Sequence, residues 1–226
     1  MAKLSKVREV IVAYNASGAA RAAREGYVVM IVDVIDMSTS LEAALQGGAF
    51  MVLGASPDIT KAPVQVNPYK IGAYAASKAR EEKKEIVIIA EPRWGTKEER
   101  ISGCSLLLQG LGGRIKDYLV IPNLGGEVGK IVSFKNKIVI CVSDTGGVAY
   151  DAAWQYSKNI TTGTIARTIF SRSNQSAVAS VERVLGLAKE KNIAVVAASG
   201  NAIEDVLAAN YLAQKIIEGG QLDLHT

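Results

Sequence analysis

Short apolar runs alternate along this chain with longer segments in which apolar residues recur every three or four positions. The first pattern predicts β-strands, and the second predicts amphipathic helices. Several runs, such as the one at residues 28–34, are apolar at nearly every position, which is typical of strands covered on both faces. The predicted strands are residues 7–14, 28–34, 50–53, 85–90, 118–121, 137–142, 160–164 and 193–198.

Helical segments lie between most of these strands. The predicted helices are residues 17–25, 38–46, 68–83, 98–110, 148–158, 174–191 and 202–218. This alternation is typical of α/β architecture, so we expect a three-layer α/β/α fold with a mostly buried parallel or mixed sheet. A chain of 226 residues can build such a fold as one domain, residues 1–226. Two packed lobes, residues 1–135 and 136–226, are the alternative.

Polar turns follow several of the predicted strands and lead into, or nearly into, a helix. In open α/β sheets, ligands bind beyond the carboxyl ends of the strands, where helix N-termini point. We therefore expect the acidic residues at these positions to converge on one cleft. They are Asp33, Glu91, Asp144 and the pair Glu204 and Asp205.

The segment DVIDMSTS at residues 33–40 has two interpretations. In the structural one, Thr39 caps the following helix, with Glu42 at the spacing of a capping box. In the functional one, Asp33 binds a divalent cation and Asp36 lies beside it, while the start of the helix receives an oxyanion. The residues that would offer hydroxyls and amides to that oxyanion are Ser38, Thr39 and Ser40.

Two further strand ends carry candidate groups. Glu91 ends a buried strand and is followed by Arg93, a combination suited to ligand binding, although a lone glutamate there is usually solvated. The next candidate is a glycine-containing turn whose backbone amides would approach an anion, or which would serve only as a tight connection. That turn consists of Asp144, Thr145, Gly146 and Gly147.

Two helix starts complete the set of candidates. Arg172 would meet a phosphate or sulfonate, while Asn174 or Ser173 would cap the helix that follows. Glu204 and Asp205 lie in the first turn of the last predicted helix, where acids favour the positive end of the helix dipole. Their position after a strand also makes them candidates for the same cleft.

The composition excludes several kinds of chemistry. The only histidine is His225, one residue from the C-terminus, which rules out most Ser-His-Asp and Cys-His mechanisms and any zinc site that needs two histidines. Cys104 and Cys141 are isolated and suit reduced packing residues of a cytoplasmic protein. Carboxylates, hydroxyls and Arg remain, and they suit a hard cation such as Mg²⁺.

Charge and hydropathy limit the partners. The net charge of +4 favours small anionic ligands, but Lys and Arg are scattered, which disfavours nucleic acid. No apolar stretch is long enough to cross a membrane, and the N-terminus lacks the apolar region of a signal peptide. We expect a cytoplasmic protein; whether it forms a homodimer stays open.

Taken in order, these motifs resemble those of the 2-phosphosulfolactate phosphatase family, the Mg²⁺-dependent enzymes of coenzyme M biosynthesis. The resemblance covers about residues 28–216 and includes DVIDMSTSLEAALQGGA from residue 33, AEPR from 90, SRSNQSAVA from 171 and IEDVLAAN from 203. It implies a hydrolase that releases phosphate from a small phosphorylated anion. Together with the positions at the strand ends, it leads us to expect Asp33, Asp36, Glu91 and Arg93 to be catalytic and Asp33, Glu91, Glu204 and Asp205 to bind the metal.

The departures from the family pattern concern the substrate. The family has Arg where this chain has Asp36, and its Thr-Asn-Gly-Thr loop corresponds to residues 144–147. Its Asn-Ser-Pro element has no counterpart. Two alternatives therefore stay open: a non-catalytic protein that binds an anion or nucleotide, and a nucleotide-dependent transferase that uses the loop at residues 144–147.

Overall fold

The computed structural model of the chain describes residues 9–112, 118–172 and 174–219. The beginning of the first predicted strand, Ser173 and His225 lie outside these residues. Each predicted strand is present within about two residues of its expected bounds, because an apolar run between turn residues marks a buried strand clearly. The strands are β1 (Val10–Tyr14), β2 (Val28–Val32), β3 (Met51–Ala55), β4 (Ile86–Ala90), β5 (Tyr118–Pro122), β6 (Ile138–Val142), β7 (Ile160–Gly163) and β8 (Ile193–Ala197).

The helices also follow the sequence pattern, with one exception. The predicted helix at residues 98–110 is wrong as a single helix, because Gly103 ends one helix and Asp58 caps the next by accepting hydrogen bonds from the amides of Ser105 and Leu106. The helices are α1 (Asn15–Arg24), α2 (Met37–Gln46), α3 (Pro68–Glu82), α4 (Lys97–Ser102), α5 (Ser105–Leu111), the 3₁₀ helix η1 (Gly125–Lys130), α6 (Gly146–Trp154), α7 (Gln175–Ala188) and α8 (Ile203–Gly219).

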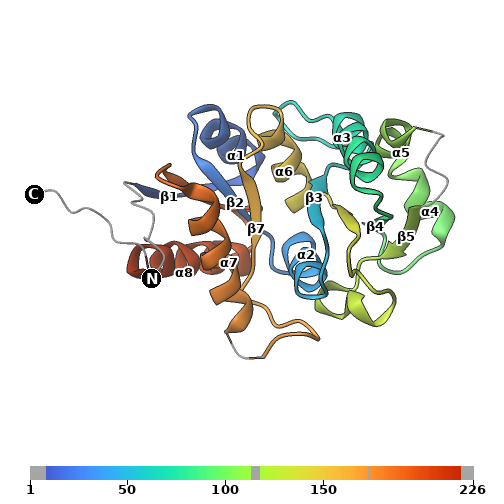
Figure 1. The fold of residues 1–226 in the computed structure, drawn as a ribbon. Helices are drawn as coiled ribbons and strands as arrows, with labels where there is room; N and C mark the ends of the chain where they lie inside the picture. The colour runs from blue at the N-terminus through green and yellow to red at the C-terminus, as the bar shows by residue number, and fades with distance from the viewer. Residues whose placement is uncertain (1–8, 113–117, 173, 220–226) are drawn as a thin grey trace, which may run out of the picture.

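The strands form two four-stranded sheets in which every pairing is parallel. The first sheet has the order β1-β8-β2-β7, and the second has the order β3-β6-β4-β5. Helices cover the strands on both sides, so that α1, α6 and α3 lie above them and α8, α7 and α2 lie below them in Figure 1. The expected three-layer α/β/α fold is confirmed.

The two sheets repeat one arrangement. When β1, β2, β3 and β4 are exchanged with β5, β6, β7 and β8, the order β1-β8-β2-β7 becomes β5-β4-β6-β3, which is the second sheet read from its other end. Each sheet therefore contains two strands from the first half of the chain and two from the second. The two sheets do not correspond to the segments 1–135 and 136–226, because the chain crosses from one sheet to the other twice.

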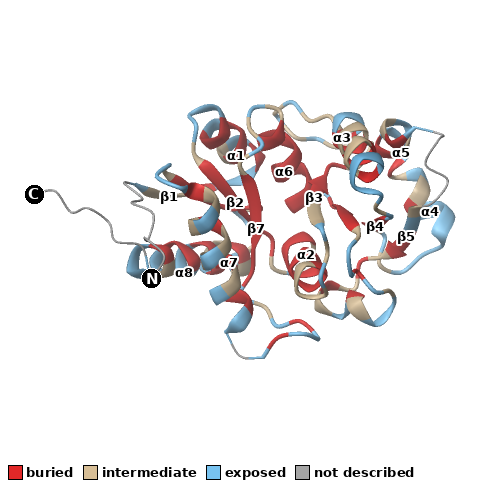
Figure 2. Ribbon diagram, viewed as in Figure 1, coloured by how far each residue is buried: buried red, intermediate tan, exposed pale blue. Residues whose placement is uncertain are grey.

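The helices that make the two crossings, α2 and α6, occupy the middle of the molecule. Helix α2 connects β2 to β3, and α6 connects β6 to β7. Every residue of α6 is buried, and α2 is buried from Met37 to Ala44 (Figure 2). A surface helix would show a polar face, so these two helices have their polar side chains inside the protein, where each one needs a partner.

The two central helices carry matching buried acids. Glu42 and Asp151 each lie five positions after the first residue of their helix, since 42 − 37 and 151 − 146 both equal 5. The side-chain amide of the glutamine four residues later donates to each of them: Gln46 to Glu42 at 3.0 Å and Gln155 to Asp151 at 2.8 Å. This match supports the repeat seen in the strand order.

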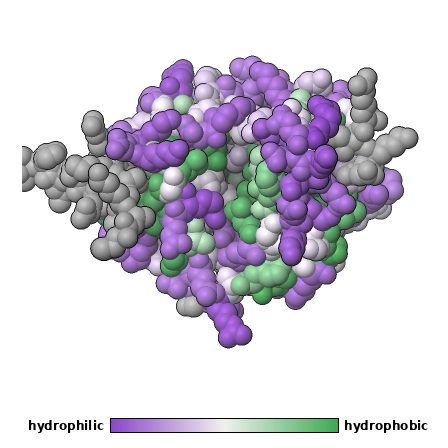
Figure 3. All heavy atoms as spheres, viewed as in Figure 1, coloured by the Kyte–Doolittle hydropathy of each residue, from purple (hydrophilic) through white to green (hydrophobic). Residues whose placement is uncertain are grey.

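Hydrophobic and hydrophilic residues are mixed on the surface. On the face shown in Figure 3, hydrophilic residues dominate the upper part, and hydrophobic residues gather in areas nearer the middle. None of the helices within the described ranges is long and apolar enough to cross a membrane.

Candidate functional site

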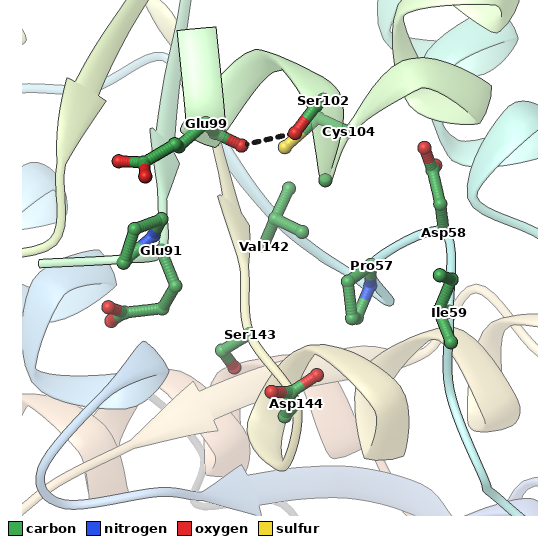
Figure 4. A pocket seen from close by; sticks show the side chains of 12 residues that line it. Pro57, Asp58, Ile59, Glu91, Glu99, Ser102, Cys104, Val142, Ser143 and Asp144 are labelled. Atoms are coloured by element: carbon green, nitrogen blue, oxygen red, sulfur yellow. Dashed lines mark hydrogen bonds between the residues drawn. The ribbon is translucent and has the colours of Figure 1, made fainter. Parts of the chain in front are cut away.

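A pocket of about 430 Å³ opens beside the carboxyl ends of β3, β4 and β6. We call it the β4 pocket. Figure 4 shows Glu91, Ser143 and Asp144 along one side of it and Asp58 and Ile59 on the other. Ligands bind at this edge in parallel α/β sheets. The lining residues are Pro57, Asp58, Ile59, Glu91, Pro92, Glu99, Ser102, Gly103, Cys104, Val142, Ser143 and Asp144.

Asp33 lies at the boundary between the two sheets and is 3% exposed. Its Oδ2 accepts hydrogen bonds from the Gly146 amide at 2.7 Å and from the Thr145 hydroxyl at 3.0 Å. Its Oδ1 accepts from the Asp36 amide at 3.2 Å. Oδ2 thus joins the end of β2 to the start of α6, and Oδ1 holds the turn before α2, so Asp33 has a structural role whatever else it does.

The surroundings of Asp36 oppose its ionisation. Burial is the main reason that its pKa rises to about 6, and the negative charges of Asp33, Glu91 and Asp144 raise it further. Arg93 opposes this shift, since its Nη2 lies 3.6 Å from Oδ1 of Asp36. Asp33, Glu91 and Asp144 therefore lie close enough to Asp36 to repel its charge, and we call the four residues the acidic cluster.

Glu91 belongs both to the acidic cluster and to the lining of the β4 pocket. It follows β4, whose five residues are all buried, so the strand positions the carboxylate at the sheet edge. Its Oε1 is buried and accepts no hydrogen bond from any described residue. A buried, unpartnered carboxylate oxygen is unfavourable, and a cation or a hydrogen-bond donor of a ligand would relieve it.

The hydroxyl groups at the start of α2 are not directed at a ligand. Ser38 Oγ donates to the Ile31 carbonyl at 3.0 Å and accepts from the Asp33 amide at 2.9 Å. Thr39 Oγ1 donates to the Val34 carbonyl, and Ser40 Oγ donates to Asn123. All three residues are buried. They hold the turn after β2 in place.

The predicted capping box is wrong. Helix α2 begins at Met37, so Thr39 lies inside the helix and Asp36 occupies the N-cap position without making a side-chain capping bond. Glu42 is fully buried and pairs with Arg183 of α7 at 2.5 Å. The spacing of Thr39 and Glu42 matched a capping box, but the burial of α2 directs both side chains elsewhere.

The turn at residues 144–147 also makes internal hydrogen bonds. The Gly146 amide donates to Asp33, and the Gly147 amide donates to Ser143 Oγ at 2.9 Å. A Cβ on Gly147 would lie 2.0 Å from the Ala55 carbonyl oxygen, so this glycine allows α6 to pack closely against β3. These amides are occupied, whereas Asp144 is exposed at the pocket.

Arg172 and Asn174 lie away from the β4 pocket. Asn174 is at the N-cap position of α7 but makes no side-chain capping bond, and the Arg172 amide donates to Gln175. Ser176 in the first turn of α7 accepts a hydrogen bond from Gln46, the last residue of α2, whereas the acidic cluster adjoins the first residues of α2. Helix α2 has ten residues and is therefore about 15 Å long, so its length separates Ser176 from the acidic cluster.

Asp205 and Glu204 begin α8, as the sequence predicts. Asp205 Oδ1 accepts from the Val34 amide at 2.8 Å, and Oδ2 accepts from the Ser199 amide at 3.2 Å. Burial raises the Asp205 pKa to about 6. Asp205 is therefore near Asp33 but holds two backbone segments together, and neither it nor Glu204 lines the β4 pocket.

The four predicted metal ligands do not form one set. Among residues 9–112, 118–172 and 174–219, no group of three or more His, Cys, Asp or Glu side chains is arranged to hold a metal ion. Mg²⁺ is commonly held by one or two carboxylates, with waters and substrate oxygens completing its shell. Glu91 and Asp36 fit that smaller requirement, because each is an oxygen donor in surroundings with excess negative charge.

Several pocket residues were not predicted from the sequence. Asp58, Ile59 and Ser143 line the pocket, and Glu99 accepts a hydrogen bond from the Thr96 amide in the capping box of α4. Asp58 lies in a segment without regular periodicity after β3, and its only signal was that it follows a strand. The same rule that selected Glu91 would have found it.

No model of a known protein family matches the sequence, and no curated protein matches it significantly. The resemblance to 2-phosphosulfolactate phosphatases therefore stays a prediction based on short motifs in a common order.

Proposed function

We propose that this chain is a metal-assisted hydrolase of small phosphomonoesters that acts at the β4 pocket. The main support is the crowding of Asp36, Glu91 and Asp144 beside a single arginine, Arg93. An acid with a raised pKa beside a cleft, such as Asp36, is typical of functional sites. The motif resemblance supports the same class of reaction.

Excess negative charge is the feature that calls for a metal. The acidic cluster contains four carboxylates, and the positive charge of Arg93 only partly offsets their effect on Asp36. A bound Mg²⁺ would supply charge neutralisation for the phosphate and polarise the phosphorus–oxygen bonds. Glu91 would hold it, with waters and phosphate oxygens completing its shell.

Arg93 and Asp36 would carry the remaining chemistry. The Arg93 guanidinium would donate hydrogen bonds to phosphate oxygens, for which its planar shape is suited. The Asp36 carboxylate, with a pKa of about 6, is mostly ionised at neutral pH and can accept the proton of an attacking water. The water oxygen bonds to phosphorus, the bond from phosphorus to the alcohol oxygen breaks, and that oxygen takes a proton from solvent.

The nucleotide-dependent transferase is less well supported. A phosphate-binding loop needs free backbone amides, but those of Gly146 and Gly147 donate to Asp33 and Ser143. A non-catalytic binding protein would keep the same pocket without turnover, so the assay below separates it from a phosphatase.

Phosphate release from a panel of phosphomonoesters, measured with Mg²⁺ and after EDTA treatment, tests the proposal. We expect turnover only with the metal. We also expect Glu91→Gln and Arg93→Ala to lower kcat/KM by about 100-fold, which is the usual effect of losing a group that stabilises transition-state charge.

Two surface variants serve as matched controls. Glu98→Gln removes an exposed carboxylate from the first turn of α4, and Arg80→Ala removes an exposed guanidinium from α3. Neither residue lines the pocket, so both variants should retain the activity of the unaltered protein. Full activity after EDTA treatment, or equal losses in the control and site variants, would contradict the proposal.

A further inference from the structure

The β4 pocket has an unusual charge for a protein that acts on anions. Its titratable lining residues are Asp58, Glu91, Glu99, Asp144 and Cys104, and the lining includes no Lys, Arg or His. Burial raises the pKa of Cys104 to about 12, so this thiol is neutral. The pocket wall is therefore negative, and its other lining groups are neutral.

Two of these carboxylates are already engaged in the fold. Asp58 accepts from the amides of Ser105 and Leu106, and Glu99 accepts from the amide of Thr96. Glu91 and Asp144 differ from them, because Oε1 of Glu91 has no partner among the described residues and the Asp144 side chain takes part in no hydrogen bond there. In Figure 4 Glu91 lies at the left of the pocket, and Asp144 lies at its lower edge.

The neighbouring cations do not neutralise this wall. Arg93 lies 3.6 Å from Asp36, which is outside the lining. The Nη1 group of Arg100 donates to the carbonyls of Pro92 and Gly95, so its guanidinium is held by the loop after β4. A carboxylate or sulfonate entering the pocket would meet like charges, whereas an ammonium would meet the Asp144 carboxylate.

From the pocket's size, the four carboxylates of its lining and the exposed Asp144 carboxylate that no described residue binds, we propose that the β4 pocket binds the cationic end of a phosphorylated amino alcohol. This inference rests on the proposed phosphatase function and names its substrate class. A volume of about 430 Å³ accommodates a small metabolite of this kind. The phosphate would lie towards Glu91 and Arg93, and the ammonium group would lie at Asp144.

Three substrates of similar size test the inference. They are O-phosphoethanolamine with an ammonium end, propyl phosphate with a neutral end, and 2-phosphoglycolate with a carboxylate end. With Mg²⁺ present, we expect kcat/KM for O-phosphoethanolamine to exceed that for propyl phosphate by at least about ten-fold, since a hydrogen-bonded charge typically gives such a factor. We expect 2-phosphoglycolate to be the poorest of the three.

Asp144→Asn and Asp144→Lys test whether Asp144 selects the substrate by the charge of its non-phosphate end. The ratio of kcat/KM for O-phosphoethanolamine to that for propyl phosphate should fall about ten-fold in the first variant, and the preference should turn towards 2-phosphoglycolate in the second. Glu98→Lys makes the same change of charge outside the pocket and should leave the ratio as it is. Equal kcat/KM values for the three substrates, or a ratio unaffected by Asp144, would overturn the inference.

A binding measurement separates this inference from the proposed function. If none of the three compounds releases phosphate, the phosphatase proposal fails, and calorimetric titration with O-phosphoethanolamine and 2-phosphoglycolate in the presence of Mg²⁺ then decides the inference. Tighter binding of O-phosphoethanolamine that weakens in Asp144→Asn would support it. Equal binding of the two compounds, or binding of neither, would refute it.

Discussion

The Asp33 carboxylate accepts a hydrogen bond from the backbone amide of Gly146 at a distance of 2.7 Å. The two residues lie 113 positions apart in the chain. Asp33 follows β2 of the first sheet, and Gly146 begins α6 after β6 of the second sheet. This single contact joins the two sheets at their carboxyl edge, and the acidic cluster and the β4 pocket lie beside it.

Asp33→Asn should therefore destabilise the protein. Asn has one acceptor oxygen where Asp33 has two, so either the bonds from Gly146 and Thr145 or the bond from the Asp36 amide is lost. We expect the free energy of unfolding to fall by about 2 kcal/mol, as for hydrogen bonds to a charged group. Urea denaturation of Asp33→Asn beside Asp144→Asn, whose side chain is exposed, measures the effect. Losses of equal size in the two variants would show that Asp33 does not join the sheets.

The free energy of unfolding should decrease as the pH rises between the unfolded-state and folded-state pKa values of Asp36 and Asp205. Asp36 and Asp205 each have a pKa of about 6 in the folded protein against 3.8 in the unfolded chain. The folded state therefore binds more protons between these values, and its stability falls until both acids are ionised. Denaturation midpoints measured from pH 4.5 to 7.5 should show a weaker decline in Asp36→Asn/Asp205→Asn than in the unaltered protein. Parallel pH profiles would contradict this prediction.

Removing Arg183 from its buried ion pair with Glu42 should strongly lower the free energy of unfolding. Glu42 is fully buried, and Arg183 Nη2 donates to it and to the Thr162 carbonyl. Arg183→Met leaves the Glu42 charge without its partner, so we expect a loss of about 3–5 kcal/mol in unfolding free energy.

Two further variants test whether the unpaired charge of Glu42 causes the loss of stability in Arg183→Met. Adding Glu42→Gln to Arg183→Met removes the unpaired charge and should restore part of the stability. Lys215→Met breaks an exposed pair with Glu218 and should leave the denaturation midpoint unchanged. A double variant no more stable than Arg183→Met would argue against charge burial as the cause.

Two glycines should respond in opposite ways to an added methyl group. In Gly54→Ala the new Cβ would lie 2.5 Å from Met37 Sδ and 2.7 Å from Tyr150 Cβ, because β3 packs directly against both central helices. We expect a loss of about 1–3 kcal/mol from overpacking. Gly186→Ala, in an exposed part of α7 with no atom within 4 Å, should instead gain about 0.5–1 kcal/mol in helix propensity. Thermal denaturation of both variants checks the signs.

Asp36→Arg should lower both KM and kcat for phosphosulfolactate. In the unaltered protein Asp36 adds a negative charge beside Asp33, Glu91 and Asp144, which opposes the binding of a substrate carrying several negative groups. An arginine there would add to Arg93 and pair with a phosphate or sulfonate oxygen, so KM should fall. It cannot accept the proton of the attacking water, so kcat should fall as well. Steady-state kinetics with saturating Mg²⁺ measure both constants, and Glu98→Arg provides the same charge change on the surface. A kcat that rises in Asp36→Arg would show that Asp36 is not the base.

The positions of the strands and most helices could be predicted from the sequence, because they depend on local patterns. The runs that became β2, β4, β6 and β8 are apolar throughout, and every residue in those strands is buried. The split between α4 and α5 could not be predicted this way, since the hydrogen bonds from Ser105 and Leu106 to Asp58 join residues 47 and 48 positions apart.

The candidate site was predictable only in part. Asp33, Asp36, Glu91, Arg93 and Asp144 each follow a strand, and parallel strands bring their carboxyl ends to a common edge, so their proximity followed from the pattern. Arg172 and Asn174 satisfied the same pattern but lie near the other end of α2, because the chain after β7 extends towards Gln46 before α7 begins.

What the sequence by itself determined is therefore the set of elements and the acids at their ends, since periodicity and turn chemistry act over a few residues. The tertiary structure decided which polar groups are available to a ligand. Ser38, Gly146 and Gly147 have the chemistry of an anion site, yet α2 and α6 are buried where the two sheets meet, and the donors of these three residues are satisfied from within. Glu91 and Asp144 remain available because they lie at the edge where the second sheet ends and the pocket begins.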